Sequence, residues 1–189
     1  LYTPFEDGEV RYVNRHHAKA WAVKQAADPW DVRLTRTGQF LETIGRQFPH
    51  VEIRNLSPLM DELRLIKSPA EIDLLRRAGH LTAVGLIEAI RSTAPGVMEY
   101  QLDAAIRYHY LAGGAADRAY NAIVAGGANA YYAHYFQNNC PLADGDIVLG
   151  DCAPDCGHYT SDIGRMWPVN GTYSPEQRAI YGFVVEYHK

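Results

Sequence analysis

The sequence lacks several features that would place it in a specialised class. Its three cysteines, Cys140, Cys152 and Cys156, are odd in number and have no framework spacing, which excludes a disulfide scaffold and favours a reducing compartment. The net charge of −4 gives no basic footprint, so nucleic acid is not expected as a partner. No apolar run approaches the roughly 18 residues of a membrane span, and no signal-peptide pattern stands at the start. These absences predict an ordinary globular protein of the cytoplasm, without a membrane partner.

The ends of the sequence suggest a piece of a longer protein. The first residue is Leu1 rather than Met, and the last residues interrupt a predicted helix at 176–187. With 189 residues, the chain has room for one domain or for one domain and part of another. A charge-rich connector follows Ser57-Pro58, and we place a domain boundary between residues 64 and 65.

The first third of the chain carries a strand–helix–strand pattern. Residues 9–13 could form a strand, residues 37–48 have apolar positions at helical spacing, and residues 51–53 alternate as a short strand does. This order is typical of a small α/β domain.

Three helices are predicted after the boundary. Ser68 and Glu71 form a capping box at the start of the first, which runs to about Arg91. The second covers 99–111, with Leu102, Ile106 and Tyr110 in line. The third covers 176–187, where Ser174 and Gln177 repeat the capping box and Ile180, Phe183 and Val184 share one face. For the first helix, the spacing predicts one buried stripe, made of Ile72, Leu75, Gly79, Thr82, Ala83, Leu86 and Ile90.

Two carboxylates flank a predicted hairpin. Asp151 follows the apolar run at 147–149, and Asp162 lies on the returning segment. A hairpin folded between Cys156 and Gly157 would place the two Asp residues opposite each other, with side chains about 4.5–5.5 Å apart. Carboxylates held that close repel unless a proton or a cation lies between them, so a divalent metal site is predicted here. The simpler alternative is a strand-end Asp151 and a solvated Asp162.

Two other groups allow more than one interpretation. Cys152, Cys156 and His158 could be part of a small zinc cluster, although the spacing is not a standard one and a fourth ligand is missing; buried, inert thiols are the alternative. His134 lies among aromatic residues upstream of the hairpin. It is either a histidine packed in an aromatic cluster or a group that binds or shuttles a proton near the metal.

Several ordered motifs resemble the pita-bread metallopeptidases of the aminopeptidase P, prolidase and creatinase group. They include the segment 65–72 at the start of the first helix, 123–127 followed by His134-Tyr135, 144–151, and 160–171. The resemblance covers about two-thirds of the chain. It implies an α+β fold in which 65–189 is the N-terminal half of a pita-bread catalytic domain and 1–64 is the C-terminal part of a creatinase-like N-terminal α/β domain.

The resemblance also implies roles for three residues. Asp151 and Asp162 match the two Asp ligands of a site that holds two divalent ions, manganese or alternatively cobalt or zinc. His134 matches an active-site histidine that contacts the substrate or the reacting centre and is not a metal ligand. The remaining ligands of the family, one His and two Glu, would lie beyond Lys189. The chain departs from the family pattern at Cys152-Ala153, where Ala and Gly are usual, and at Gly164, where Thr is common.

The function implied by the resemblance is metal-assisted removal of the N-terminal residue from peptides with proline in second position. The His134-Tyr135 and 165–171 segments are slightly more similar to aminopeptidase P than to prolidase. A prolidase acting on Xaa-Pro dipeptides, or a pita-bread domain used only for binding, are the alternatives. Family resemblance also suggests a dimer or a larger homo-oligomer.

Overall fold

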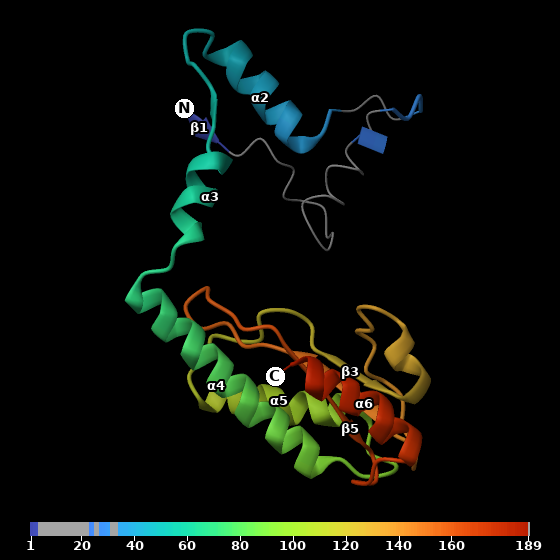
Figure 1. Ribbon diagram of the computed structural model, residues 1–189. Coiled ribbons are helices and arrows are strands. Elements are labelled where there is room, and N and C mark those ends of the chain that lie inside the picture. The colour runs from blue at the N-terminus through green and yellow to red at the C-terminus, as the bar shows by residue number, and fades with distance from the viewer. Residues whose placement is uncertain (4–22, 25–26, 31–33, 189) are drawn as a thin grey trace. The chain divides into compact units, whose positions relative to one another are not determined.

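The computed structural model describes residues 1–3, 23–24, 27–30 and 34–188. Contacts within the chain divide it into two compact units, Leu1–Lys67 and Ser68–Lys189 (Figure 1). The boundary predicted between residues 64 and 65 falls in the last turn of α3 (Ser57–Leu65). The assignment of the two parts to an N-terminal domain and a catalytic domain stays a prediction. No helix of the described residues is long and apolar enough to cross a membrane.

Between residues 34 and 67 the first unit contains the helices α2 (Arg36–Gln47) and α3, together with a short strand. Strand β1 (Tyr2–Thr3) pairs in parallel with β2 (Arg54–Asn55), and helix α2 confirms the helix predicted at 37–48. The strand predicted at 51–53 is wrong, because pairing begins only at Arg54, whose amide donates to the Leu1 carbonyl at 2.9 Å. The strand predicted at 9–13 lies outside the described residues.

The second unit begins with two helices at the predicted places, and the first of them confirms the predicted capping box. Helix α4 (Pro69–Ser92) starts with a complete capping box: the Glu71 amide donates to Ser68 Oγ at 3.4 Å, and the Ser68 amide donates to Glu71 Oε2 at 2.6 Å. Helix α5 (Glu99–Ala112) follows. The line of apolar residues predicted along α5 is fully buried against α4 and the sheet.

The stripe that α4 buries differs from the one predicted. Ile72 and Ile90 are exposed, and the true stripe is rotated toward small residues. A Cβ added to Gly85 would lie only 3.1 Å from side-chain carbons of Ile106 and Tyr110, so the small residues let α5 approach closely. The buried residues of α4 are Ala78, Leu81, Thr82, Gly85, Leu86 and Ala89.

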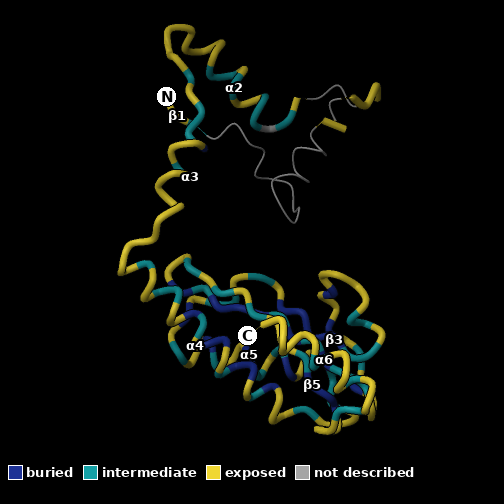
Figure 2. The backbone as a smooth tube through the Cα atoms, viewed as in Figure 1, coloured by how far each residue is buried: buried dark blue, intermediate teal, exposed yellow. Residues whose placement is uncertain are grey.

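Three antiparallel strands form the sheet of the second unit, in the order β3-β4-β5. They are β3 (Ile123–Gly126), β4 (Ile147–Cys152) and β5 (Ile163–Pro168), and the short helix η1 (Gly127–Tyr131) follows β3 directly. Figure 2 shows the buried residues concentrated in the strands and in the inner sides of α4 and α5.

Residues of β4 alternate between the two faces of this sheet. Val148, Gly150 and Cys152 are buried, and the first and third belong to the core that α4 and α5 cover. Leu149 faces the other way and packs against a smaller cluster formed by Ile123, Ala125 and Tyr135. Asp151 therefore lies on the face turned away from the helices.

Helix α6 (Pro175–Tyr187) starts at a second capping box, as predicted, with Ser174 as the cap. Within the described chain it has no buried residue. The apolar side chains that share its predicted face are exposed, at 68% for Ile180, 77% for Phe183 and 55% for Val184.

Candidate functional site

The hairpin that carries the two Asp residues has a different register from the one predicted. Asp151 pairs with Gly164, and Asp162 precedes the first residue of β5. The reason is the turn: Gly157 and His158 both have left-handed backbones, with φ of 63° and 68°, and lie between the bridged residues Cys156 and Tyr159. This is the two-residue turn type that hairpins favour. The prediction that Asp151 and Asp162 lie directly opposite each other is therefore wrong.

The two carboxylates nevertheless converge, and the hydroxyl of Tyr120 lies between them. Tyr120 Oη is 2.6 Å from Asp151 Oδ1 and 3.1 Å from Asp162 Oδ1. Burial and the hydrogen bond to Asp151 raise the pKa of Tyr120. The phenol therefore keeps its proton and can donate it to one carboxylate at a time.

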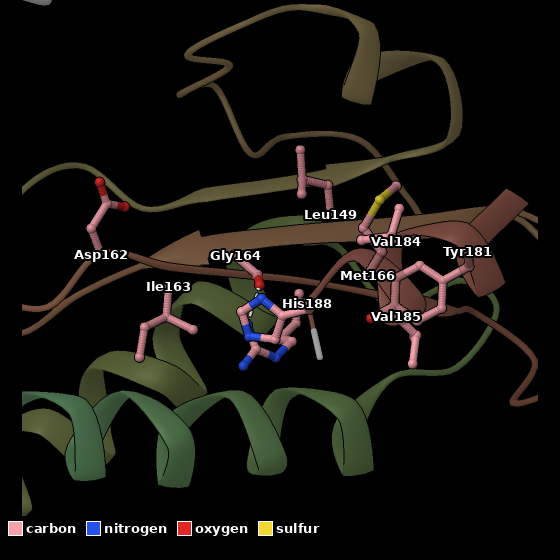
Figure 3. Close-up of a pocket in the computed structure, with 10 residues that line it drawn as sticks. Leu149, Asp162, Ile163, Gly164, Met166, Tyr181, Val184, Val185 and His188 are labelled. Atoms are coloured by element: carbon pink, nitrogen blue, oxygen red, sulfur yellow. Dashed lines mark hydrogen bonds between the residues drawn. The ribbon is translucent and has the colours of Figure 1, made fainter.

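The surroundings of the pair are only partly closed. Asp151 is half-buried, whereas Asp162 is exposed. Asp162 lies at one end of a groove of about 780 Å³ between β5 and α6, with Tyr181 and Val185 at the other end (Figure 3).

His134 is presented by the loop that follows η1. Its ring is exposed and stacks on Phe136, with centroids 5.8 Å apart and planes 6° from parallel. Its neighbour Tyr135 packs against Ile123 and Ala125, and Ile123 is the β3 partner of Asp151. The loop of His134 therefore covers the same face of the sheet that bears Asp151. The ring itself is not a buried member of an aromatic core.

The chemistry of the pair fits a divalent cation. Two converging carboxylates supply hard oxygen ligands, and a cation would relieve their mutual repulsion. Among the described residues, no group of three or more His, Cys, Asp or Glu side chains gathers as a metal cluster. Asp151 and Asp162 could therefore hold a cation together only as part of a larger ligand set.

The alternative zinc cluster does not form. Cys152 and Cys156 are buried free thiols, and burial raises the pKa of Cys152 to about 11. The side chain of His158 is 98% exposed. These thiols behave as small core residues.

Tyr120 is the site residue that sequence reasoning missed. It lies three residues before strand β3. Its approach to both carboxylates depends on the pairing of β3 with β4, where Ile123 is opposite Asp151. The sequence signal that could have identified Tyr120 is a tyrosine just before a strand that pairs with the strand bearing Asp151. This signal becomes specific only when the strand pairing is known.

Comparison with known proteins gives the same family from sequence and from structure. The family model described as metallopeptidase family M24 matches residues 73–189. A Xaa-Pro aminopeptidase of Haemophilus influenzae is 44% identical over 138 residues, which are 73% of this chain and 32% of that protein. The chain spans about a third of the length of the curated relatives that it matches.

Solved structures agree. Aminopeptidase PepP of Pseudomonas aeruginosa superposes with a TM-score of 0.71 and 39% identity, covering 85% of this chain and 37% of that one. Zinc-substituted aminopeptidase P of Escherichia coli, in complex with product, gives a TM-score of 0.71 and 34% identity, covering 86% of this chain and 38% of that one. The predicted α+β pita-bread architecture is thereby confirmed. The chain belongs to metallopeptidase family M24.

Proposed function

We propose that the protein containing this chain is a metal-dependent Xaa-Pro aminopeptidase, which removes the N-terminal residue from peptides with proline in second position. The observation that carries the proposal is the convergence of Asp151 and Asp162 on one phenol oxygen, in a chain of a metallopeptidase family. The names of the relatives, Xaa-Pro aminopeptidase and aminopeptidase P, support the substrate class.

Asp151 and Asp162 are proposed as metal ligands, and Tyr120 holds them in place. The hydroxyl of Tyr120 donates to Asp151 and restrains the orientation of a carboxylate that must also face a cation. Two divalent ions bound here, manganese in our proposal, would polarise the scissile carbonyl and lower the pKa of a bound water. Zinc or cobalt could replace manganese, and the zinc-substituted Escherichia coli relative supports the first of these.

His134 is proposed as the catalytic histidine of the same face. Its exposed imidazole can donate a hydrogen bond to the oxyanion of the tetrahedral intermediate or carry a proton. Because the ring stacks on Phe136, its plane is restrained before a substrate binds. A homo-oligomer and a cytoplasmic location complete the proposal; the three free thiols support a reducing compartment.

The test uses the full-length protein and Asp162→Ala. We expect the variant to lose at least one equivalent of bound Mn²⁺, measured by titration calorimetry. Hydrolysis of a Xaa-Pro-Xaa tripeptide should fall by more than the roughly 10–100-fold expected for a residue that only supports a ligand. The matched control is Asp73→Ala, an exposed Asp on α4 that forms an ion pair with Arg76 at 3.6 Å, and it should leave both quantities unchanged.

The choice of substrate separates the proposal from its alternatives. Turnover of the tripeptide by the wild-type protein supports an aminopeptidase, whereas turnover of a Xaa-Pro dipeptide alone would indicate a prolidase. Full activity of metal-loaded Asp162→Ala would overturn the assignment of the ligands.

A further inference from the structure

Glu99 stands apart from the other buried polar residues of the described chain because its side chain is a carboxylate. It is 0% exposed and begins helix α5. No Lys, Arg or His of the described residues forms an ion pair with it. A buried carboxylate is strongly unfavourable unless hydrogen bonds replace the lost water. An apolar side chain would fill the same space at lower cost, so Glu99 must have a role other than packing.

Four donors saturate this carboxylate. Oε1 accepts from the Gly126 amide at 2.8 Å and from Asn129 Nδ2 at 2.9 Å. Oε2 accepts from Tyr135 Oη at 2.8 Å and from the Cys140 amide at 2.9 Å. An ionised carboxylate offers about four lone-pair sites and no donor, so the ionised form matches this set.

The donors all come from one continuous stretch of chain. Gly126 ends β3, and the other three belong to the segment 127–140, which contains His134. Tyr135 directly follows His134 in the sequence. Burial and the bond to Glu99 raise the pKa of Tyr135, so its hydroxyl retains the proton that it donates. Glu99 thus fixes the segment 127–140 on both sides of His134.

Asn138 fixes the same segment at a further point. It is 5% exposed, and its side-chain amide pairs with the outer edge of the sheet as a strand would. Oδ1 accepts from the Val124 amide at 3.0 Å, and Nδ2 donates to the Ala122 carbonyl at 2.9 Å.

The backbone between these anchors is strained. His134 has φ of 57° and Asn138 has φ of 45°. Non-glycine residues seldom adopt this left-handed conformation, although Asn and His do so more often than most, and it persists where the surrounding structure holds it. The strain therefore falls on the residue proposed to act on substrate, within a segment held by Glu99 and Asn138.

We propose that Glu99 is a positioning residue, whose four hydrogen bonds hold the segment 127–140 so that the imidazole of His134 faces the substrate. The inference rests on the proposed function, because it needs His134 to act in the reaction. A purely structural Glu99 would stabilise the fold without affecting His134 in particular.

The test compares Glu99→Gln with wild type in the full-length, metal-loaded protein. Glutamine keeps the shape but replaces one acceptor oxygen with an N–H donor, which must then face donors such as the Cys140 amide or Asn129. We expect kcat for a Xaa-Pro-Xaa peptide to fall roughly 10- to 100-fold, as for a catalytic group displaced by about an ångström. KM and the number of bound Mn²⁺ ions should stay within twofold.

A double-mutant cycle with His134→Ala decides between positioning and structure. If Glu99 acts through His134, Glu99→Gln should change kcat by less than twofold in the His134→Ala background. An equal loss of kcat in both backgrounds would overturn the positioning role. Wild-type activity of His134→Ala itself would instead sink the role of His134 and leave the fold of the segment unaffected.

Two further variants keep the test decisive if Glu99→Gln does not fold. Tyr135→Phe removes one of the four donors and keeps the buried ring. It should lower kcat by a smaller factor than Glu99→Gln does, and only when His134 is present. Unchanged kcat in Tyr135→Phe would count against the proposal. The matched control is Glu88→Gln on α4, a surface Glu whose partner Arg91 is 3.8 Å away, which should leave kcat unchanged.

Discussion

The two faces of the sheet in the second unit differ in what covers them. The face toward α4 and α5 is closed, and Val148 and Cys152 on it are 0% exposed. The opposite face carries the half-buried Asp151, and α6 has no buried side chain within the described chain. Packing is therefore concentrated on one face, and the proposed metal ligands lie on the other. Substitutions on the closed face should change stability, and substitutions on the open face should change metal binding.

The largest expected effect comes from truncating a large buried side chain on the closed face. Leu102 is 0% exposed between α4 and the sheet, so Leu102→Ala should lower the free energy of unfolding by about 2–5 kcal/mol. Urea unfolding of the full-length protein measures this, and the affinity of the folded protein for Mn²⁺ should not change. Arg76→Ala on the exposed side of α4 is the control and should stay within about 0.5 kcal/mol. If Leu102→Ala lowered the free energy of unfolding by no more than the control does, the closed face would not be the main source of stability.

A pair of glycines on adjacent strands sharpens the contrast. A Cβ on Gly150 would lie 2.7 Å from a ring carbon of Trp167 on the closed face, whereas the nearest atom to a Cβ on Gly164 is 3.9 Å away. Gly150→Ala should therefore cost about 1–3 kcal/mol by overpacking, and Gly164→Ala should be nearly neutral. Thermal unfolding of the two variants checks the difference, and equal melting temperatures would contradict it.

The smallest expected effect is on the open face. Tyr120→Phe removes the hydroxyl that lies between Asp151 and Asp162. The affinity for Mn²⁺ should weaken about tenfold, which is the lower end of what losing a ligand's hydrogen-bond partner produces. Titration calorimetry measures it, with Tyr108→Phe at an exposed position of α5 as the control. Unchanged affinity would mean that Tyr120 does not orient the carboxylates.

The helices of the second unit were predictable because their signals are local. Ser68 with Glu71, and Ser174 with Gln177, lie within one turn of each other, and the structure shows both capping boxes. The buried stripe of α4 was harder, because it follows the small residues that face α5 rather than the large apolar ones. Hydrophobicity alone favours Ile72 and Ile90, whereas close packing favours Gly85.

The candidate site was predictable in part. A turn centred one residue later than expected moves the partner of Asp151 from Asp162 to Gly164. A shift of two positions along a strand keeps a side chain on the same face, which is why the carboxylates still converge although the register was wrong. The roles of Tyr120 and Glu99 arise from contacts between segments far apart in the sequence, so no local sequence pattern predicts them.

The amide of Asn138 has a consequence for association with other chains. Strand β3 is an outer strand of the described sheet, and free amides and carbonyls on such a strand recruit foreign strands and promote aggregation. Asn138 already satisfies the Ala122 carbonyl and the Val124 amide. The segment that carries His134 thus also blocks the pairing of a strand from another molecule, so loosening this segment should promote aggregation.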